Sequence, residues 1–308
     1  AKRGGVYRVP LEQYPGSMDI HQSPDTNART LSGYVFGRLL TYTNGPRANK
    51  DEPTPAPDAA ASYEIADDGM TVIFKLRPNV RFHQPVDRSV TAEDVVTSFQ
   101  RVVGTAPGTR PGPNAPRFTF LDSVMAPDAA TVVLKLRRPY APLLTLLSEP
   151  IYVPIMPKET LNALEPAKIM VGSGPFAMEK ADQNTGVRLS RHAAWHFGPE
   201  VPYFDAVEWP VVAEYAARIT QSAAGNLDTA ARVGAQDLIR LRSQVRGLQY
   251  SWRTVGFSAI AFSPKEKNAP LADVRVRHAV SMGLDRDAMA EAIYDYQLLR
   301  NNGIDIPV

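Results

Sequence analysis

The sequence predicts a protein of the α/β class. From its start, short runs in which apolar and polar residues alternate, as in strands, are interspersed with segments whose apolar residues recur every three or four positions, as in helices. Residues 62–65 and 71–76 are alternating runs on either side of the turn sequence Asp67-Asp68-Gly69, which predicts a β-hairpin. Residues 91–94, Thr-Ala-Glu-Asp, have the form of a capping box, which predicts a helix that begins there.

The segments before this hairpin fit the same class. Residues 5–9 alternate as a short strand and then meet Pro10, which would end the strand. Residues 27–40 carry apolar side chains at every fourth position, which predicts a helix with one buried face. The stretch 53–57 is rich in proline and is expected to be a connection or a domain boundary.

Strand and helix patterns also alternate after the capped helix. A proline- and glycine-rich insertion at 104–116 follows that helix, and Pro142 is placed to begin a helical turn of leucines. A last helix is expected to be capped by Asp285. The further elements expected are strands at 119–126, 131–137, 186–191, 206–212 and 256–262, and helices at 214–224, 236–243, 273–282 and 287–296.

The composition argues against several classes of function. The 308 residues suggest about two domains, and the net charge of +2 provides no basic field for nucleic acid. The absence of cysteine excludes disulfides, thiolate metal sites and cysteine nucleophiles. The apolar stretch 139–157 contains several prolines and Glu149, which a membrane-spanning helix would tolerate poorly. A soluble protein is therefore expected.

Neither the histidines nor the glycine-rich turn gives positive evidence of catalysis. His192 and His196 have the i, i+4 spacing of zinc ligands on a helix. Ala193, however, stands where a zinc metalloprotease has its glutamate, so surface or hydrogen-bonded histidines are the favoured interpretation. The sequence Gly172-Ser173-Gly174-Pro175 completes neither a phosphate loop nor a serine-nucleophile motif, and its two glycines favour a tight turn. We therefore expect no enzyme activity, no metal and no cofactor.

Four motifs follow one another along the chain: residues 60–77, residues 80–101, the turn Gly172-Ser173-Gly174-Pro175-Phe176, and residues 270–286. Together they resemble the family 5 extracellular solute-binding proteins of ABC transporters, which include oligopeptide, dipeptide and nickel binders. Residues 84–88 depart from the family pattern, because most members have a short Asp-Gly turn there. Family members also continue well beyond the last motif, so the chain resembles the N-terminal portion of a member.

The resemblance implies a type II periplasmic-binding-protein-like lobe with an inserted α+β subdomain. On this interpretation residues 1–49 and 171–255 form a discontinuous lobe I, and residues 50–170 form the inserted subdomain. Residues 256–308 would then cross the hinge and begin a truncated lobe II. Most of the second lobe is expected to be missing from the chain.

The resemblance also implies a function without bond making: capture of a peptide or similar small solute between two lobes, and its delivery to an ABC permease at the membrane. A monomer is expected, located in the periplasm or at the cell surface, with anchoring as a lipoprotein through a removed N-terminal segment. The alternative is a binding-protein scaffold that acts as a sensor or an adhesion module without transport. The solute is left open among peptides, nickel chelates, sugars and other small molecules.

In the family, ligands are faced by the loop after the first strand, by an aromatic position before the second strand pair, and by the leucine-rich stretch. Glu149 is of particular interest, because an acid among leucines must face water, a partner or a ligand, and it would suit a cationic group. Each candidate also has a plain structural role open to it, as a surface loop, a core side chain or a solvated charge. The candidate ligand-binding residues are His21, Gln22, Ser23, Arg117, Phe118, Glu149 and Tyr152.

Overall fold

The structure is a computed structural model that describes residues 3–43, 48, 52–251 and 270–304. The chain forms two compact units, Ala1–Tyr215 and Ala216–Val308. The strand predicted at 256–262 lies outside the described residues. Among the residues described, no helix is both long and apolar enough to cross a membrane.

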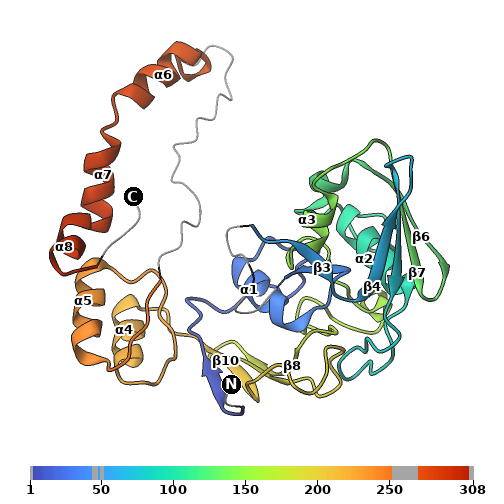
Figure 1. The fold of residues 1–308 in the computed structure, drawn as a ribbon, viewed down its shortest axis with the longest axis horizontal. Coiled ribbons are helices and arrows are strands. Elements are labelled where there is room, and N and C mark those ends of the chain that lie inside the picture. The colour runs from blue at the N-terminus through green and yellow to red at the C-terminus, as the bar shows by residue number, and fades with distance from the viewer. Residues whose placement is uncertain (1–2, 44–47, 49–51, 252–269, 305–308) are drawn as a thin grey trace. The chain divides into compact units, whose positions relative to one another are not determined.

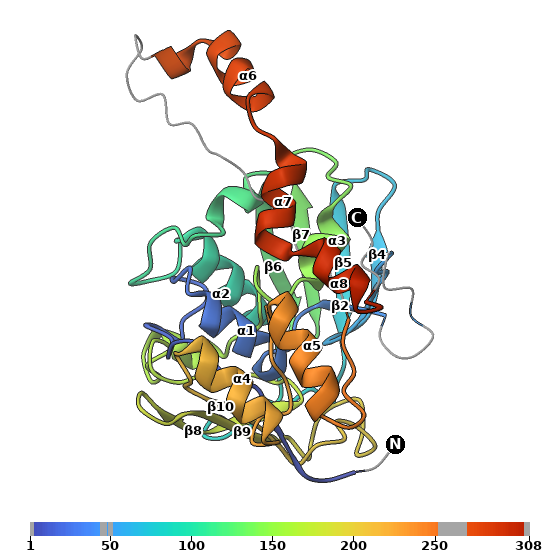
Figure 2. The ribbon, with the colours of Figure 1, turned by 90° about the vertical axis from the view of Figure 1, so that its left-hand side faces the viewer.

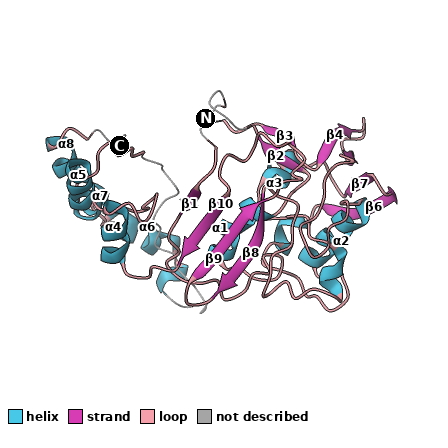
Figure 3. Cartoon of the chain, turned by 90° about the horizontal axis from the view of Figure 1, so that it is seen from below, coloured by secondary structure: helices cyan, strands magenta, loops and turns pink. Residues whose placement is uncertain are grey.

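The N-terminal unit contains two hydrophobic cores, of which core A is built on a four-stranded sheet (Figure 3). The strand order is β1-β10-β9-β8, in which β1 runs parallel to β10 and the other neighbours are antiparallel. Trp209 is buried in core A, and its ring meets the Tyr34 ring edge-on at 4.8 Å between centroids. The bounds are β1 (Val6–Arg8), β8 (Phe176–Asp182), β9 (Gly186–Arg191) and β10 (Ala206–Pro210).

The helix of core A, α1 (Thr26–Val35), is shorter than the pattern at 27–40 predicts. The Asp25 carboxylate caps its start, where it accepts hydrogen bonds from two backbone N–H groups. The helix ends at Val35, and the chain then turns extended to form β2 (Leu40–Tyr42), which pairs with β3 (Pro55–Pro57). The apolar periodicity continues past the helix end because Leu39, the next residue of the pattern, is buried in the second core. The proline-rich connection thus contains a short edge strand, a position that proline tolerates.

Core B is built on the second sheet, whose strand order is β4-β5-β7-β6 with every pair antiparallel. The helix α2 (Ala92–Val103) packs against β6 and β7 (Figure 1). The predicted hairpin and capping box are confirmed, and Gly104 ends the helix with φ +81°, which glycine adopts without strain. The other elements are β4 (Ala60–Ile65), β5 (Thr71–Leu76), β6 (Leu121–Asp128), β7 (Thr131–Leu136), α3 (Leu143–Ser148) and the 3₁₀ helices Ala115–Phe118 and Lys158–Leu161.

The C-terminal unit is helical in its described part. Its small apolar core includes Leu238, Leu299 and Ile304, where α5 meets α8 (Figure 2). The single helix predicted at 287–296 is interrupted, because Asp295 adopts φ +53° between α7 and α8. Asp285 caps α7 as predicted. The helices are α4 (Tyr215–Ala223), which begins at the unit boundary, α5 (Ala235–Gln244), the 3₁₀ helix Pro270–Ala272, α6 (Val274–Met282), α7 (Arg286–Tyr294) and α8 (Tyr296–Asn301).

The domain boundaries expected from the family remain a prediction. The two compact units meet at residue 215, which lies inside the range 171–255 expected for lobe I. Core B comprises buried residues between Leu39 and Ile155, whereas core A draws on the segments before and after that range. Core A and core B are the structural features to which the predicted lobe I and inserted subdomain correspond most closely.

Core A and core B are joined by a buried ion pair. Nη2 of Arg101, on α2, lies 2.5 Å from Oδ2 of Asp19, which precedes α1. The two side chains are 4% and 9% exposed. The side chain of Gln22 reinforces the same junction, because its amide nitrogen donates to the carbonyls of Arg101 (2.7 Å) and Arg110 (3.0 Å). The C-terminal turn of α2 is therefore anchored to the loop that leads into α1.

Replacement of this arginine should weaken the junction strongly. Arg101→Met keeps the apolar stem but leaves the Asp19 carboxylate buried without its cation, so the free energy of unfolding in urea should fall by about 3–5 kcal/mol. The matched control is Arg137→Met, which removes an ion pair whose side chains are 63% and 56% exposed and should cost less than about 1 kcal/mol. Equal losses in the two variants would contradict this account of the junction.

Candidate functional site

Two of the candidate ligand-binding residues, Glu149 and Tyr152, lie in the segment 149–154, which we call the strip, and His21 and Arg117 contact it. The strip begins where α3 ends, because Glu149 leaves the helix with an extended backbone. On one side it contacts the segment around α1, where the Ser32 hydroxyl donates to the Pro150 carbonyl (3.0 Å). On the other side the Asn114 amide donates to the Ile151 carbonyl (2.7 Å). The strip therefore runs along the junction of core A and core B.

Glu149 is half-buried and is bonded to a tyrosine of β2. The Tyr42 hydroxyl lies 2.7 Å from Oε1 of Glu149. Burial and then the bond to Glu149 raise the pKa of Tyr42, so its phenol stays neutral and donates. The nearby Arg38 has Nε and Nη1 buried without a hydrogen-bond partner, and burial lowers its pKa despite the opposing effects of Asp58 and Glu149. The strip thus begins with a carboxylate whose hydrogen-bond partner is a neutral phenol.

Arg117 and Tyr152 form the second contact of the strip. The Arg117 guanidinium lies over the Tyr152 ring at 4.7 Å from its centroid, a cation–π arrangement. Arg117 is exposed and Tyr152 is half-buried. Phe118, by contrast, is only 3% exposed and packs edge-on against Phe99 of α2. Arg117, Tyr152 and Glu149 are therefore the members of the predicted set that combine a reactive or charged group with access to solvent.

The loop residues of the predicted set have protein partners in this conformation. His21 is fully buried, and its Nε2 lies 2.9 Å from the Pro154 carbonyl at the end of the strip. Gln22 donates to carbonyls of core B, as described above, and the Ser23 hydroxyl accepts from the Asp25 backbone N–H (3.3 Å). Of these side chains, His21 connects the loop before α1 to the strip. Ligand contact by any of the seven residues remains a prediction.

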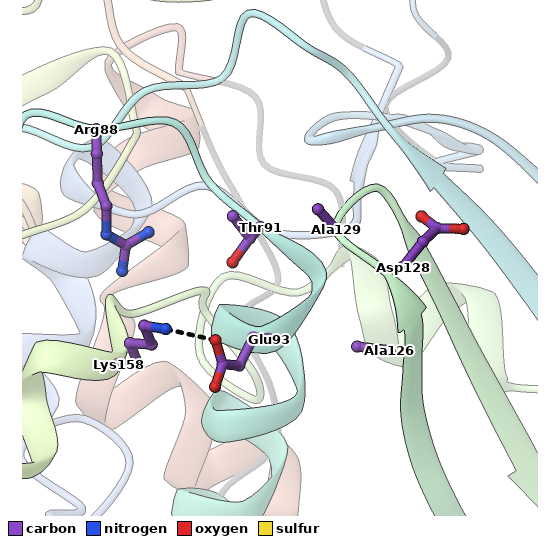
Figure 4. A pocket seen from close by; sticks show the side chains of 7 residues that line it. All are labelled: Arg88, Thr91, Glu93, Ala126, Asp128, Ala129 and Lys158. Carbon is purple, nitrogen blue, oxygen red and sulfur yellow. Dashed lines mark hydrogen bonds and ion pairs between the residues drawn. The ribbon is translucent and has the colours of Figure 1, made fainter.

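A polar pocket of about 510 Å³ lies elsewhere, beside the start of α2 (Figure 4). Its main feature is Arg88, whose guanidinium bonds to both oxygens of Asp94 (2.7 and 2.8 Å) and to both oxygens of Glu159 (2.6 and 2.9 Å). Lys158 and Glu93 form an ion pair at the same pocket. Each basic side chain is thus neutralised by an acid. The lining residues are Arg88, Thr91, Glu93, Ala126, Asp128, Ala129 and Lys158.

Sequence reasoning did not find this network, because Arg88 appeared only as part of the unusual loop 84–88. The Asp94 side chain is fully buried. Burial acts to raise the pKa of Asp94, but hydrogen bonds from Arg88 and from the backbone N–H groups of Thr91 and Lys158 outweigh it and lower the pKa. Asp94 is both the capping residue of α2 and the anchor of Arg88, so the network holds the 3₁₀ helix at 158–161 against α2.

A second pocket, of about 540 Å³, is apolar and aromatic. It lies against core A, where the rings of Tyr7 and Phe204 stack at 5.1 Å between centroids. Few polar groups line this pocket, and the sequence analysis did not predict it. The lining residues are Tyr7, Gly33, Tyr34, Pro175, Phe176, Trp195, Val201, Pro202, Tyr203, Phe204 and Val207.

The two histidines at zinc-like spacing bond to different partners. Nδ1 of His192 lies 3.2 Å from the Gly174 carbonyl, and Nε2 of His196 lies 2.9 Å from Oδ1 of Asp58. They follow β9 in a turn and not in a helix. Within the described residues, no group of three or more histidine, aspartate or glutamate side chains could hold a metal ion. The arrangement fits hydrogen-bonded structural histidines.

Comparison with known proteins assigns the family. Residues 54–307 match the family described as bacterial extracellular solute-binding proteins, family 5 Middle. The chain belongs to this family. It is 28% identical over 287 residues to heme-binding protein A of Haemophilus influenzae, covering 87% of this chain and 51% of the relative. It is 25% identical to the probable di/tripeptide-binding protein 5 of Pseudomonas aeruginosa, covering 97% and 59%.

Solved structures of periplasmic binding proteins show the same fold. The binding protein MoaA of A. tumefaciens R10, in complex with mannopinic acid, matches with a TM-score of 0.77 and 26% identity over 95% of this chain and 57% of that one. DppA of Helicobacter pylori, in complex with the peptide STSA, matches with a TM-score of 0.78 and 22% identity. The chain thus spans between about half and three fifths of the lengths of these proteins, and the predicted periplasmic-binding-protein fold with most of the second lobe missing is confirmed.

Substitution of the buried acid of the polar pocket should be costly. Asp94→Asn removes the charge that faces Arg88, and the free energy of unfolding at pH 7 should fall by about 3 kcal/mol or more. The neighbouring control, Glu93→Gln, removes an exposed ion pair and should cost less than about 1 kcal/mol.

The pH dependence provides an independent check. Because the folded-state pKa of Asp94 lies below the ordinary value of 3.8, its stabilisation is complete above that value and is lost as the pH falls through the folded pKa. The difference between wild type and Asp94→Asn, followed by urea denaturation, should therefore shrink below about pH 4. A difference that stays constant down to pH 2 would contradict the role given to this carboxylate.

Proposed function

We propose that this chain is part of the solute-binding component of an ABC importer, which captures a peptide or similar small solute between two lobes and delivers it to a membrane permease. The observation that carries the proposal is the family match over residues 54–307. Relatives named as di/tripeptide-binding and dipeptide-binding proteins support a peptide-like solute. Family membership implies an extracytoplasmic location; anchoring as a lipoprotein and a monomeric state belong to the proposal.

The proposed cycle of capture and delivery forms no covalent bond with the solute. A solute favours the closed form of a two-lobed protein only to the extent that it binds that form more tightly than the open one. Micromolar capture corresponds to about −8 kcal/mol of binding free energy. For a peptide, most of this would come from backbone hydrogen bonds, which depend little on side-chain identity. The strip lies at the junction of the two cores and carries two of the candidate residues, Glu149 and Tyr152.

The strip also suggests which end groups the solute carries. The Glu149 carboxylate is half-buried and is bonded to the neutral phenol of Tyr42, so a cationic group of the solute would complete its pairing. Arg117, stacked on Tyr152 and exposed, would accept an anionic group. We infer that the solute carries both charges, as the free amino and carboxyl groups of a peptide do.

The complete gene product provides the test. Native mass spectrometry of protein purified from its own host should show a co-purified solute, and calorimetry with that solute should give the affinity of each variant. Glu149→Gln should weaken binding about 10- to 100-fold, because a charge-assisted hydrogen bond becomes neutral. The control is Glu165→Gln, which alters an exposed glutamate outside the strip and should leave the affinity unchanged.

Unchanged affinity in Glu149→Gln would contradict the role of this carboxylate. Transport itself is tested by uptake of the labelled solute in cells that lack the gene. Loss of uptake supports the importer, whereas normal uptake together with solute binding would favour a sensor or an adhesion module.

A further inference from the structure

His83, which belongs to the family motif at residues 80–101, is buried at the junction of core A and core B. It is 3% exposed and follows Phe82 of core B. Its backbone N–H donates to the Gly172 carbonyl (2.7 Å). The Gly172 N–H donates in turn to Nδ1 of the His83 ring (3.4 Å), and Nε2 lies 3.0 Å from the Gly174 carbonyl. The glycine-rich turn at 172–175 therefore binds both ring nitrogens of His83.

These bonds fix the protonation state of His83. An acceptor at Nδ1 and a donor at Nε2 describe the neutral ring with its proton on Nε2. A second proton on Nδ1 would face the Gly172 N–H, so one bond would be lost and two donors would oppose each other. The His192 ring lies edge-on at 4.6 Å, and its Nδ1 lies near the same Gly174 carbonyl. Burial lowers the pKa of His83 to about 4, opposed by the bond to Gly174 and aided by His192.

The charged side chains near this pair of rings act on the pKa of His192. Asp87 and Arg81 act on His192 in opposite directions, and burial lowers the pKa of His192. Arg81 and Asp87 also pair with each other at 3.1 Å. Within the described part of the chain, no carboxylate acts on the pKa of His83 itself. A protonated His83 would therefore lack a counterion.

A second buried histidine lies at the same junction. Nε2 of His21 faces the Pro154 carbonyl at 2.9 Å, whereas Nδ1 is buried without a hydrogen-bond partner. The charged groups that face His21 are those of the buried ion pair, Asp19 and Arg101. Burial lowers the pKa of His21 to about 4, with Asp19 opposing and Arg101 assisting. Protonation of His21 would thus place an N–H without an acceptor in the interior, and burial outweighs the favourable effect of Asp19.

Both rings connect the two cores. His21 follows Ile20 of core A and bonds to the strip. His83 follows Phe82 of core B and bonds to the turn that lies between Met170 and Phe176 of core A. We propose that His21 and His83 form an acid-sensitive latch between core A and core B, closed when both imidazoles are neutral and released when they are protonated. An extracytoplasmic protein experiences the external pH, so such a latch would respond to acidification of the surroundings.

The direction of the pH effect follows from the linkage between protonation of the histidines and opening of the latch. A histidine whose folded-state pKa lies below its ordinary value of 6.5 takes up a proton more readily in the open state, so the latch is closed above about pH 6.5 and weakens as the pH falls toward 4. With a folded-state pKa of about 4, each histidine shifts the opening equilibrium roughly 30-fold between pH 8 and pH 5.

Hydrogen exchange on the 308-residue chain tests the latch directly. The amides of His83, bonded to Gly172, and of Gly174, bonded to Val35, report on the junction. Amides of the β5–β7 ladder report on core B alone. After correction for intrinsic rates, the junction amides should lose at least tenfold in protection between pH 7 and pH 5 while the β5–β7 amides keep theirs. Joint loss in both sets, or no loss in either, would overturn the proposal.

Variants distinguish the effect of protonating these two histidines from a general loss of stability in acid. Gln can replace the donor on Nε2 without taking up a proton, so His21→Gln/His83→Gln should keep its junction protection nearly constant from pH 7 to pH 5, whatever its stability at pH 7. His278→Gln, in which an exposed histidine of α6 is changed, should behave as wild type. If the double variant does not fold, NMR titration of the wild-type imidazoles decides, and titration of both His21 and His83 near pH 6.5 would overturn the latch.

Discussion

The polar junction between core A and core B is the constraint on which the remainder of the N-terminal unit depends. The two hydrophobic clusters are separate, so burial of apolar surface within each does not fix one against the other. Buried polar groups connect them instead, and a buried polar group is stable only when it has a hydrogen-bond or ion-pair partner. The Arg101–Asp19 ion pair and the histidine contacts with the turn at 172–174 satisfy this requirement. The strip lies at the same junction, where His21, Ser32 and Asn114 bond to its carbonyl groups.

This arrangement explains why a binding function and acid sensitivity could share residues. The imidazole of His21, one of the candidate ligand-binding residues, is buried and bonds to the Pro154 carbonyl at the end of the strip. A ligand held by Glu149 and Tyr152, as proposed, would therefore be coupled to the junction through the strip. The strip's charged groups and its supporting groups come from different parts of the sequence, and the fold brings them together.

Local signals account for the features that the sequence predicted well. The hairpin of β4 and β5 and the capping box of α2 depend on residues within a few positions of one another, so short patterns reveal them. The end of α1 at Val35 was not predicted, because burial of Leu39 in core B continues the same periodicity. The edge strand β3 was missed because its prolines indicate a connection when read without the partner strand β2.

In the candidate site too, contacts between residues far apart in the sequence could not be predicted from local patterns. Glu149 could be singled out from sequence as an acid among leucines, but its partner Tyr42 is 107 residues away and no local pattern joins them. Arg88 was hidden in an unusual loop, since its two carboxylate partners come from α2 and from the 3₁₀ helix at 158–161. Family resemblance supplied the fold and the general function, whereas tertiary contacts determine which of the predicted residues are accessible.

A crystal structure of the complete gene product with its co-purified solute tests the central claim most directly. The account predicts that the solute lies against the strip, with a cationic group within hydrogen-bond distance of the Glu149 carboxylate and with the Tyr152 ring in contact. A solute bound with no contact to residues 149–152, for example in the aromatic pocket beside Tyr7 and Phe204, would contradict the account.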